Sequence, residues 1–233
     1  KKFCERFAIT HFFNPVRFMR LLELVRGEFT RDDVINTLDM FSETMLGKGV
    51  VSCSDTPGFL ANRVGVFAIQ CALYKAFKYK LSPTEADAFF GRPLGLPKNG
   101  VFGLYDLIGI DLMADVVKSL VSILPKNDTF HKYSSPIEFM TAMIANGQTG
   151  NKNEKGFYKQ TGDERQVIDL SNGNYGTHER LKIPLLEEAE KNGISVILND
   201  KSPYGLYIWD VVSEYLIDTQ VIRNVALNLP RVK

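Results

Sequence analysis

Residues 6–27 read RFAITHFFNPVRFMRLLELVRG, and this stretch decides the fold of the first part of the chain. Two runs within it, Arg6 to Phe13 and Leu21 to Gly27, are rich in β-forming residues and predict strands. Residues 30–46 then repeat apolar side chains at helical spacing, and residues 49–53 predict another short strand. The order strand, strand, helix, strand indicates the end of an α/β sheet.

The helix predicted over residues 30–46 carries signals at both ends. Thr30 with Asp33 resembles a capping box, and Gly47 suits the left-handed residue that follows a helix. A parallel sheet needs several strand-helix-strand units to cover both of its faces, whereas about one such unit is present before the pattern changes. We therefore expect the chain to begin in the middle of an α/β domain.

From Asp55 onward the strand signals stop and helical signals take over. Thr56 can cap a helix that has Pro57 at its first position, and apolar residues continue along one face as far as Phe77. Further helix signals recur at residues 82–85, 111–124 and 135–138. The first and last of these combine a capping serine, a first-turn proline and a reciprocal glutamate. We predict an all-helical region.

The end of the chain changes from loop to helix. Residues 147–159 are polar and contain glycines, and residues 161–177 predict a loop or a short hairpin around Asn172-Gly173. A domain boundary is therefore expected near Tyr158. Residues 204–229 predict a last helix with one apolar side, whose packing partner we expect to lie outside this chain.

The composition limits the function. The 28 basic and 27 acidic side chains leave a net charge of +1, so no field of one sign attracts nucleic acid or an anionic membrane. Cys4, Cys53 and Cys71 lack CxxC spacing, which disfavours a disulfide framework and a zinc site. No apolar run is long enough to span a membrane. We expect a cytoplasmic protein with no nucleic-acid partner, no membrane insertion and no metal.

His11 and Glu23 have surroundings that point to chemistry. A lone histidine in an apolar strand is more often a hydrogen-bonded core residue than a catalyst. Glu23, however, is the one acid in LLELV, and an ionised carboxylate among leucines needs a cationic or donor partner. Strand pairing could bring Glu23 to one imidazole nitrogen while the other faces a substrate, which is the layout of an oriented general base. Arg20 and Arg26 are alternative partners for Glu23.

Asn62 lies early in the helix predicted after Asp55, on a segment that is otherwise apolar. It could be a buried amide that acts on a substrate, or a side chain that hydrogen-bonds the backbone at the domain junction. The patterns GxGxxG, GxxxxGKS/T, GxSxG and HExxH do not occur in the sequence. The common cofactor, nucleophile and metal motifs are therefore missing from these residues.

Taken together, these residues resemble a known family. The order and spacing of several stretches are similar to those of the 3-hydroxyacyl-CoA dehydrogenases, over residues 6–159. The matching stretches are HFFNPV at 11–16, Glu23, DTPGF at 55–59, Asn62-Arg63, DLIGID at 106–111 and GNKNEKGFY at 150–158. A linked set of this kind is specific to the family.

The resemblance implies a fold and a division of the chain. Residues 1–55 would be the C-terminal part of a Rossmann-type NAD domain, and residues 56–159 the mainly α-helical C-terminal domain of the family. Arg17 to Glu23 and the segment after the loop look most like the large multifunctional β-oxidation proteins. Residues 160–202 would then be a linker, and residues 203–233 would begin a second helical repeat.

The resemblance also implies a reaction. L-3-hydroxyacyl-CoA would give its C3 hydride to NAD and become 3-ketoacyl-CoA, as in fatty-acid β-oxidation. His11 would be the general base, Glu23 would orient it, and Asn62 would hydrogen-bond the substrate oxygen. Asn14 and Lys152 would contact NAD. The implied partners are an acyl-CoA substrate and either a second copy of the protein or a β-oxidation complex.

The sequence departs from the family in two respects. The family's glycine-rich turn, its ribose-binding acid and a serine of its substrate site have no counterpart in these residues. Asn153-Glu154 replace the usual Thr-Gly beside Lys152. We therefore expect the isolated chain to be inactive, as a piece of a dehydrogenase whose NAD domain starts elsewhere. The alternative is a non-catalytic module, left from such an enzyme, that docks acyl-CoA or dimerises.

Overall fold

The computed structural model describes residues 2–96, 98–162, 164–177 and 181–217. These residues form two compact units, which we call the sheet unit (residues 2–66) and the helical unit (residues 67–217). Helix α2 (Ala61–Lys78) has its first residues in the sheet unit and the rest in the helical unit. Each unit is described by itself.

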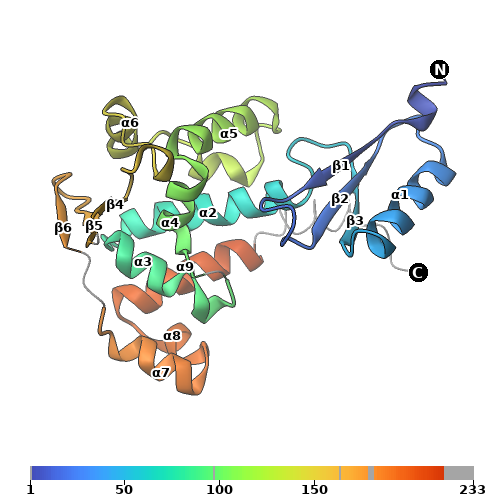
Figure 1. Cartoon of the computed structure of the whole chain (residues 1–233). Coiled ribbons are helices and arrows are strands. Elements are labelled where there is room, and N and C mark those ends of the chain that lie inside the picture. The colour runs from blue at the N-terminus through green and yellow to red at the C-terminus, as the bar shows by residue number, and fades with distance from the viewer. Residues whose placement is uncertain (1, 97, 163, 178–180, 218–233) are drawn as a thin grey trace. The chain divides into compact units, whose positions relative to one another are not determined.

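The sheet unit is built on three strands (Figure 1). A short 3₁₀ helix, η1 (Cys4–Arg6), precedes them. Strand β1 (Ala8–Phe12) pairs antiparallel with β2 (Leu21–Arg26), and β2 pairs in parallel with β3 (Gly49–Ser54). Helix α1 (Asp32–Thr44) connects β2 to β3, because two parallel strands need a crossover connection. The predicted order of strands and helix is confirmed.

Strand β2 is the buried centre of this sheet. The four consecutive residues Leu22, Glu23, Leu24 and Val25 are all buried, which means that both faces of the strand are covered. Glu23 is thereby placed in the middle of an apolar layer, directly opposite a residue of each neighbouring strand.

The capping residues predicted for the two ends of α1 agree only in part with the structure. The predicted capping box at Thr30 is wrong, because α1 begins after Arg31 and has no side-chain cap. The Thr30 hydroxyl instead accepts a hydrogen bond from the Gly27 amide at 3.0 Å and donates to the Phe7 carbonyl at 2.5 Å. Gly47 has a φ of 63°, so the predicted left-handed residue after the helix is confirmed.

The helical unit contains most of the helices and a second sheet. After α2 come α3 (Pro83–Phe89), η2 (Arg92–Leu94), α4 (Gly100–Ile108), α5 (Ile110–Ile123), η3 (Thr129–Tyr133), α6 (Glu138–Ala145), η4 (Asn151–Asn153), α7 (Pro184–Asn192), α8 (Ser195–Asn199) and α9 (Pro203–Ile217). The antiparallel strands are β4 (Tyr158–Thr161), β5 (Glu164–Ile168) and β6 (Tyr175–Thr177). The hairpin predicted around Asn172-Gly173 is therefore present, between β5 and β6. Large aromatic side chains fill the core.

The three helix starts predicted from sequence had different outcomes. The start at Ser82 is confirmed, because the Ser82 hydroxyl accepts from the Glu85 amide and the Glu85 carboxylate accepts from the Ser82 amide. The start at residues 135–138 is wrong, since α6 begins at the glutamate and has no side-chain cap. The start at Thr56 is wrong as well, because α2 begins only at Ala61.

Helix α9 packs inside this chain, contrary to the expectation that its partner lies elsewhere. Tyr207, Ile208 and Val211 are buried, and the ring of Tyr204 stacks on Phe89 of α3 with 4.8 Å between centroids. The sequence revealed an apolar side but not what covers it. Residues 218–229 of the predicted helix lie outside the described residues.

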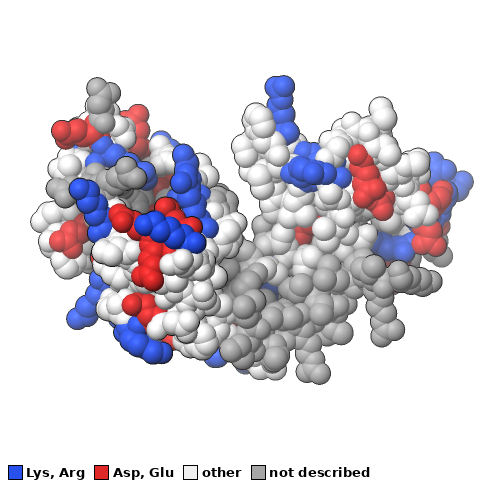
Figure 2. Space-filling view, turned by 90° about the horizontal axis from the view of Figure 1, so that it is seen from below, with Lys and Arg blue, Asp and Glu red and all other residues white. Residues whose placement is uncertain are grey.

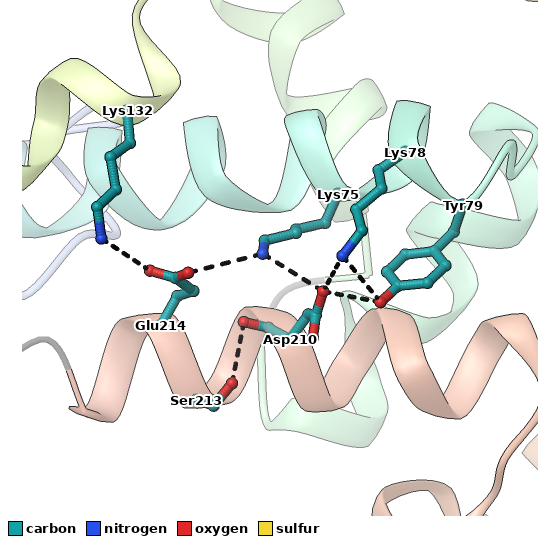
Figure 3. A network of polar contacts seen from close by, with 7 residues as sticks. All are labelled: Lys75, Lys78, Tyr79, Lys132, Asp210, Ser213 and Glu214. Atoms are coloured by element: carbon teal, nitrogen blue, oxygen red, sulfur yellow. Dashed lines mark hydrogen bonds and ion pairs between the residues drawn. The ribbon is translucent and has the colours of Figure 1, made fainter.

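The polar side of α9 is joined to α2 by charged groups (Figure 3). The Asp210 carboxylate accepts hydrogen bonds from Lys78 Nζ and Tyr79 Oη, both at 2.7 Å, and from Lys75 Nζ at 3.3 Å. Glu214 Oε1 lies 3.7 Å from Lys75 Nζ.

The segment expected to be a linker, residues 160–202, itself holds strands and short helices. The domain boundaries proposed from sequence stay predictions.

Two buried carboxylates organise the centre of the helical unit. Asp87 accepts hydrogen bonds from the amides of Phe102 and Gly103, at 2.7 and 2.9 Å, and from Tyr158 Oη at 2.8 Å. Asp106 accepts from the amides of Phe157 and Tyr158. Burial raises the pKa of Asp87 to about 7 and that of Asp106 to about 6, although the hydrogen bonds act in the opposite direction.

These raised pKa values predict a dependence of stability on pH. In the unfolded chain both carboxyls titrate near their usual value of about 4, so the folded state holds the protons more tightly. The contribution to stability is complete below about pH 4 and is lost as the pH rises through 6 and 7. The free energy of unfolding in urea should fall by on the order of 5 kcal/mol between pH 4.5 and 8. Asp87→Asn should flatten this slope, and a wild-type stability that rises over this range would contradict the assignment.

Candidate active site

His11 and Glu23 are direct neighbours across the antiparallel pair of β1 and β2. Residues opposite each other in such a pair project to the same face, so their side chains can meet. His11 Nδ1 is 2.7 Å from Glu23 Oε2. The side chain of Glu23 is 0% exposed, whereas that of His11 is 31% exposed. The suggested contact is present, and the imidazole keeps an edge that a ligand can reach.

The second oxygen of Glu23 is held by the backbone. Oε1 accepts hydrogen bonds from the amides of Leu60 and Ala61, at 2.9 and 2.6 Å. These amides lie at the start of α2, where N–H groups have no partner within the helix. Glu23 therefore caps α2 from a distant strand, which is the role that the sequence had assigned to Thr56.

Cys53 is a third group near this oxygen. Cys53 is on the neighbouring strand β3, and its Sγ lies 3.7 Å from Glu23 Oε1. Burial and the negative charge of Glu23 raise the pKa of the Cys53 thiol to about 11. The thiol stays protonated at neutral pH and is therefore a weak donor to the carboxylate.

The alternative partners of Glu23 are engaged elsewhere. Arg26 donates to the Thr30 carbonyl at 3.1 Å and forms an ion pair with Asp32. Arg20 is exposed at the surface. In the part of the chain that the structure describes, no lysine or arginine forms an ion pair with Glu23. The buried carboxylate thus relies on His11 and on backbone donors.

Two phenylalanines fix the plane of the imidazole. The His11 ring meets Phe13 edge to face at 4.8 Å between centroids and Phe59 at 5.7 Å. Within residues 2–96 and the other described ranges, His11 Nε2 has no hydrogen-bond partner. This nitrogen is consequently the atom of the pair that is available to a substrate.

Asn62 is linked to this pair through its sequence neighbour Ala61. It is the second residue of α2 and directly follows Ala61, whose amide binds Glu23. The expectation of a buried amide is wrong, because Asn62 is exposed near the start of its helix. Among the described residues its side chain forms no hydrogen bond, so it does not serve the backbone at the junction either. The amide is free to contact a ligand.

Asn14 and Lys152 lie in different units. Asn14 is exposed in the turn after β1, in the same unit as His11, Glu23 and Asn62. Lys152, in η4 of the helical unit, is 50% exposed, and its Nζ lies 2.7 and 2.6 Å from the two carboxylate oxygens of Asp111. Sequence reasoning did not foresee this ion pair.

The surface charge agrees with the near-neutral composition. Basic and acidic side chains are interspersed over the face shown in Figure 2. Within the described ranges, no group of three or more histidine, cysteine or acidic side chains is arranged to hold a metal ion. Of the helices described, none is both long and apolar enough to cross a bilayer.

Two family models match most of the chain. Residues 2–56 match the 3-hydroxyacyl-CoA dehydrogenase NAD binding domain, and residues 58–160 match the C-terminal domain of the same family. The chain belongs to the 3-hydroxyacyl-CoA dehydrogenase family. The predicted fold class, an α/β part of a Rossmann-type NAD domain followed by a mainly helical C-terminal domain, is confirmed for this family member.

Two curated relatives are much longer than this chain. A putative fatty acid oxidation complex trifunctional enzyme of Rickettsia prowazekii is 38% identical over 230 residues, which are 97% of this chain and 31% of that protein. A probable 3-hydroxyacyl-CoA dehydrogenase of Bacillus subtilis is 32% identical over 221 residues, 92% of this chain and 28% of that protein. The chain thus spans about a third of the length of these relatives.

Solved structures of the family share this fold. FadB2 of M. tuberculosis has a TM-score of 0.59 at 29% identity, and the match covers 67% of this chain and 53% of that one. The (S)-3-hydroxybutyryl-CoA dehydrogenase PaaH1 from Ralstonia eutropha has a TM-score of 0.52 at 30% identity, with the same coverage.

Proposed function

We propose that this chain carries the catalytic base of an NAD-dependent 3-hydroxyacyl-CoA dehydrogenase of fatty-acid β-oxidation. The observation that supports this most is the hydrogen bond between His11 and the fully buried Glu23, in a chain of this family. The reaction removes a hydride from C3 of L-3-hydroxyacyl-CoA and a proton from its hydroxyl group. The product is 3-ketoacyl-CoA.

His11 takes the hydroxyl proton in this proposal. Its Nδ1 donates to Glu23 while Nε2, on a side chain that is 31% exposed, accepts the proton of the substrate. The imidazole becomes positive in this step, and the adjacent carboxylate stabilises that charge. Asn62 donates a hydrogen bond to the same substrate oxygen and so holds it at His11.

The residues of the chain fit only part of an NAD site. NAD, when bound, accepts the hydride, and we propose that Asn14 and Lys152 contact it. Its pyrophosphate needs unoccupied N–H groups at a strand-to-helix turn. The turn from β2 to α1 carries Glu28 and two first-turn aspartates, and the amides after β3 are bonded to Glu23. The pyrophosphate does not fit either of these two turns.

That misfit favours one further candidate function. The chain could be an acyl-CoA-docking or dimerising module of the family that performs no turnover. The two functions differ in one observable, which is the effect of site variants on reaction rate. A module without turnover would show the same acyl-CoA affinity, and no NADH formation, with or without His11.

Partners and location follow from the same reasoning. We propose an acyl-CoA substrate and, because a similar protein is named as part of a fatty acid oxidation complex, assembly into such a complex or into a homo-oligomer. The three cysteines, one exposed and two buried, are all unpaired in the described structure. Free cysteines are typical of a reducing compartment, which supports the cytoplasm.

Glu23→Gln should lower kcat by at least about tenfold, because the imidazolium formed in the reaction loses its counter-charge. The assay is NADH formation from L-3-hydroxybutyryl-CoA by the native protein that contains this chain. Glu28→Gln, at an exposed acid of the same unit, is the matched control and should leave kcat unchanged. A Glu23→Gln enzyme within twofold of wild type would remove Glu23 from the mechanism.

A further inference from the structure

The start of α2 contacts the candidate base through Glu23. N–H groups can only donate, so the amides of Leu60 and Ala61 require Oε1 to act as an acceptor. The Cys53 thiol is a third potential donor to this oxygen. Only Oε2 can therefore carry a proton, so it can either accept a hydrogen bond from His11 or donate one to it.

Three proton arrangements fit the 2.7 Å contact between His11 Nδ1 and Glu23 Oε2. In the first, Glu23 is ionised, Nδ1 carries the hydrogen, and Nε2 has a lone pair. In the second, the pair has taken up one more proton, Oε2 donates to Nδ1, and Nε2 carries a hydrogen. In the third, which holds as many protons as the second, Glu23 is ionised and both imidazole nitrogens carry a hydrogen. Only the first arrangement can accept a proton from a substrate hydroxyl.

We propose that the Leu60 and Ala61 amides exclude the second arrangement and so act, through Glu23, as positioning groups that keep a hydrogen on His11 Nδ1 and leave Nε2 as the nitrogen that exchanges a proton. Two N–H donors and the positive end of the α2 dipole stabilise negative charge on Oε1. The carboxylate then stays an acceptor, and Nδ1 keeps its hydrogen. The catalytic consequence rests on the proposed function, whereas the effect on His11 itself does not.

Glu23→Gln tests this with a side chain of the same shape. The two amides should take the glutamine oxygen, which turns the glutamine NH₂ toward His11 Nδ1 and forces a hydrogen onto Nε2. The ¹⁵N chemical shifts of the imidazole report which nitrogen is protonated. The 233-residue chain has three histidines, so the His11 signals can be assigned with a His11→Gln variant.

The expected result is a protonated Nδ1 in the wild type and a bare Nδ1 with a protonated Nε2 in Glu23→Gln. If the variant kept its hydrogen on Nδ1, the glutamine oxygen would be facing His11 and its NH₂ would be facing the amides. The amides would then not set the orientation of residue 23, and the proposal would be overturned.

Ala61→Pro removes a single amide hydrogen. Proline is accepted at the first position of a helix, which is where Ala61 lies, and Ala61→Gly keeps the N–H as a control. We expect the share of His11 with a bare Nδ1 to increase in Ala61→Pro only. In the native protein kcat should fall roughly tenfold, with KM within about twofold, as for the loss of one hydrogen bond to a charged group.

A wild-type pattern of ¹⁵N shifts in folded Ala61→Pro would also overturn the proposal. Should Ala61→Pro not fold, the Glu23→Gln spectrum decides alone. The proposed function fails separately, if His11→Gln leaves turnover unchanged while the ¹⁵N shifts behave as expected.

Discussion

His11→Gln is expected to lower kcat by about 10²- to 10⁴-fold in the native protein that contains this chain, as is typical when a general base is removed. Glutamine can still donate a hydrogen bond to Glu23 Oε2, so the buried carboxylate keeps a partner. It cannot take a proton from the substrate. The loss should therefore appear in kcat, with KM for L-3-hydroxybutyryl-CoA changed much less.

His131→Gln is the matched control for this experiment. His131 lies in the helical unit, where its Nε2 is 2.9 Å from the Pro125 carbonyl. The His131→Gln substitution should therefore leave kcat unchanged. Urea unfolding of His11→Gln should show a midpoint close to that of the wild type. A kcat within threefold of wild type would show that another group accepts the proton.

Asn62→Ala is expected to remove roughly 2 to 4 kcal/mol of transition-state stabilisation, measured from kcat/KM. An amide placed at the reacting oxygen contributes most when charge gathers there. The side chain is exposed and has no hydrogen bond to the described residues, so the free energy of unfolding should change by less than about 0.5 kcal/mol.

Asn36→Ala, at an exposed asparagine of α1, is the control and should change neither quantity. The opposite pattern would contradict the role of Asn62. It would consist of a loss of several kcal/mol of folding stability with kcat/KM almost intact.

The sheet unit was largely predictable because its strands have strong local signals. The run LLELV predicted a strand, and the crossover helix followed from the spacing of its apolar residues. The start of α2 was predicted wrongly at Thr56, because its cap comes from Glu23, which is remote in sequence. The packing of α9 was missed for a related reason, since an apolar face does not identify its partner.

The candidate site was predictable to a similar extent. A single acid among leucines demanded a partner, and the neighbouring strand offered His11. The backbone donors of Leu60 and Ala61 could not be foreseen, because every residue except proline has an N–H group and the sequence does not show which of them bind a side chain. The exposure of Asn62 and the pairing of Lys152 with Asp111 depend on where helices begin and loops end, which local patterns fix poorly.

The most direct test of the proposed reaction follows the hydride itself. The native protein is given NAD and L-3-hydroxybutyryl-CoA that carries deuterium at C3, and both products are analysed by mass spectrometry. We expect 3-ketobutyryl-CoA without that deuterium and a nicotinamide ring that has gained it, with the rate strongly reduced in His11→Gln. Deuterium that stays on the acyl-CoA, or that is released to water without reduction of NAD, would contradict the dehydrogenase function.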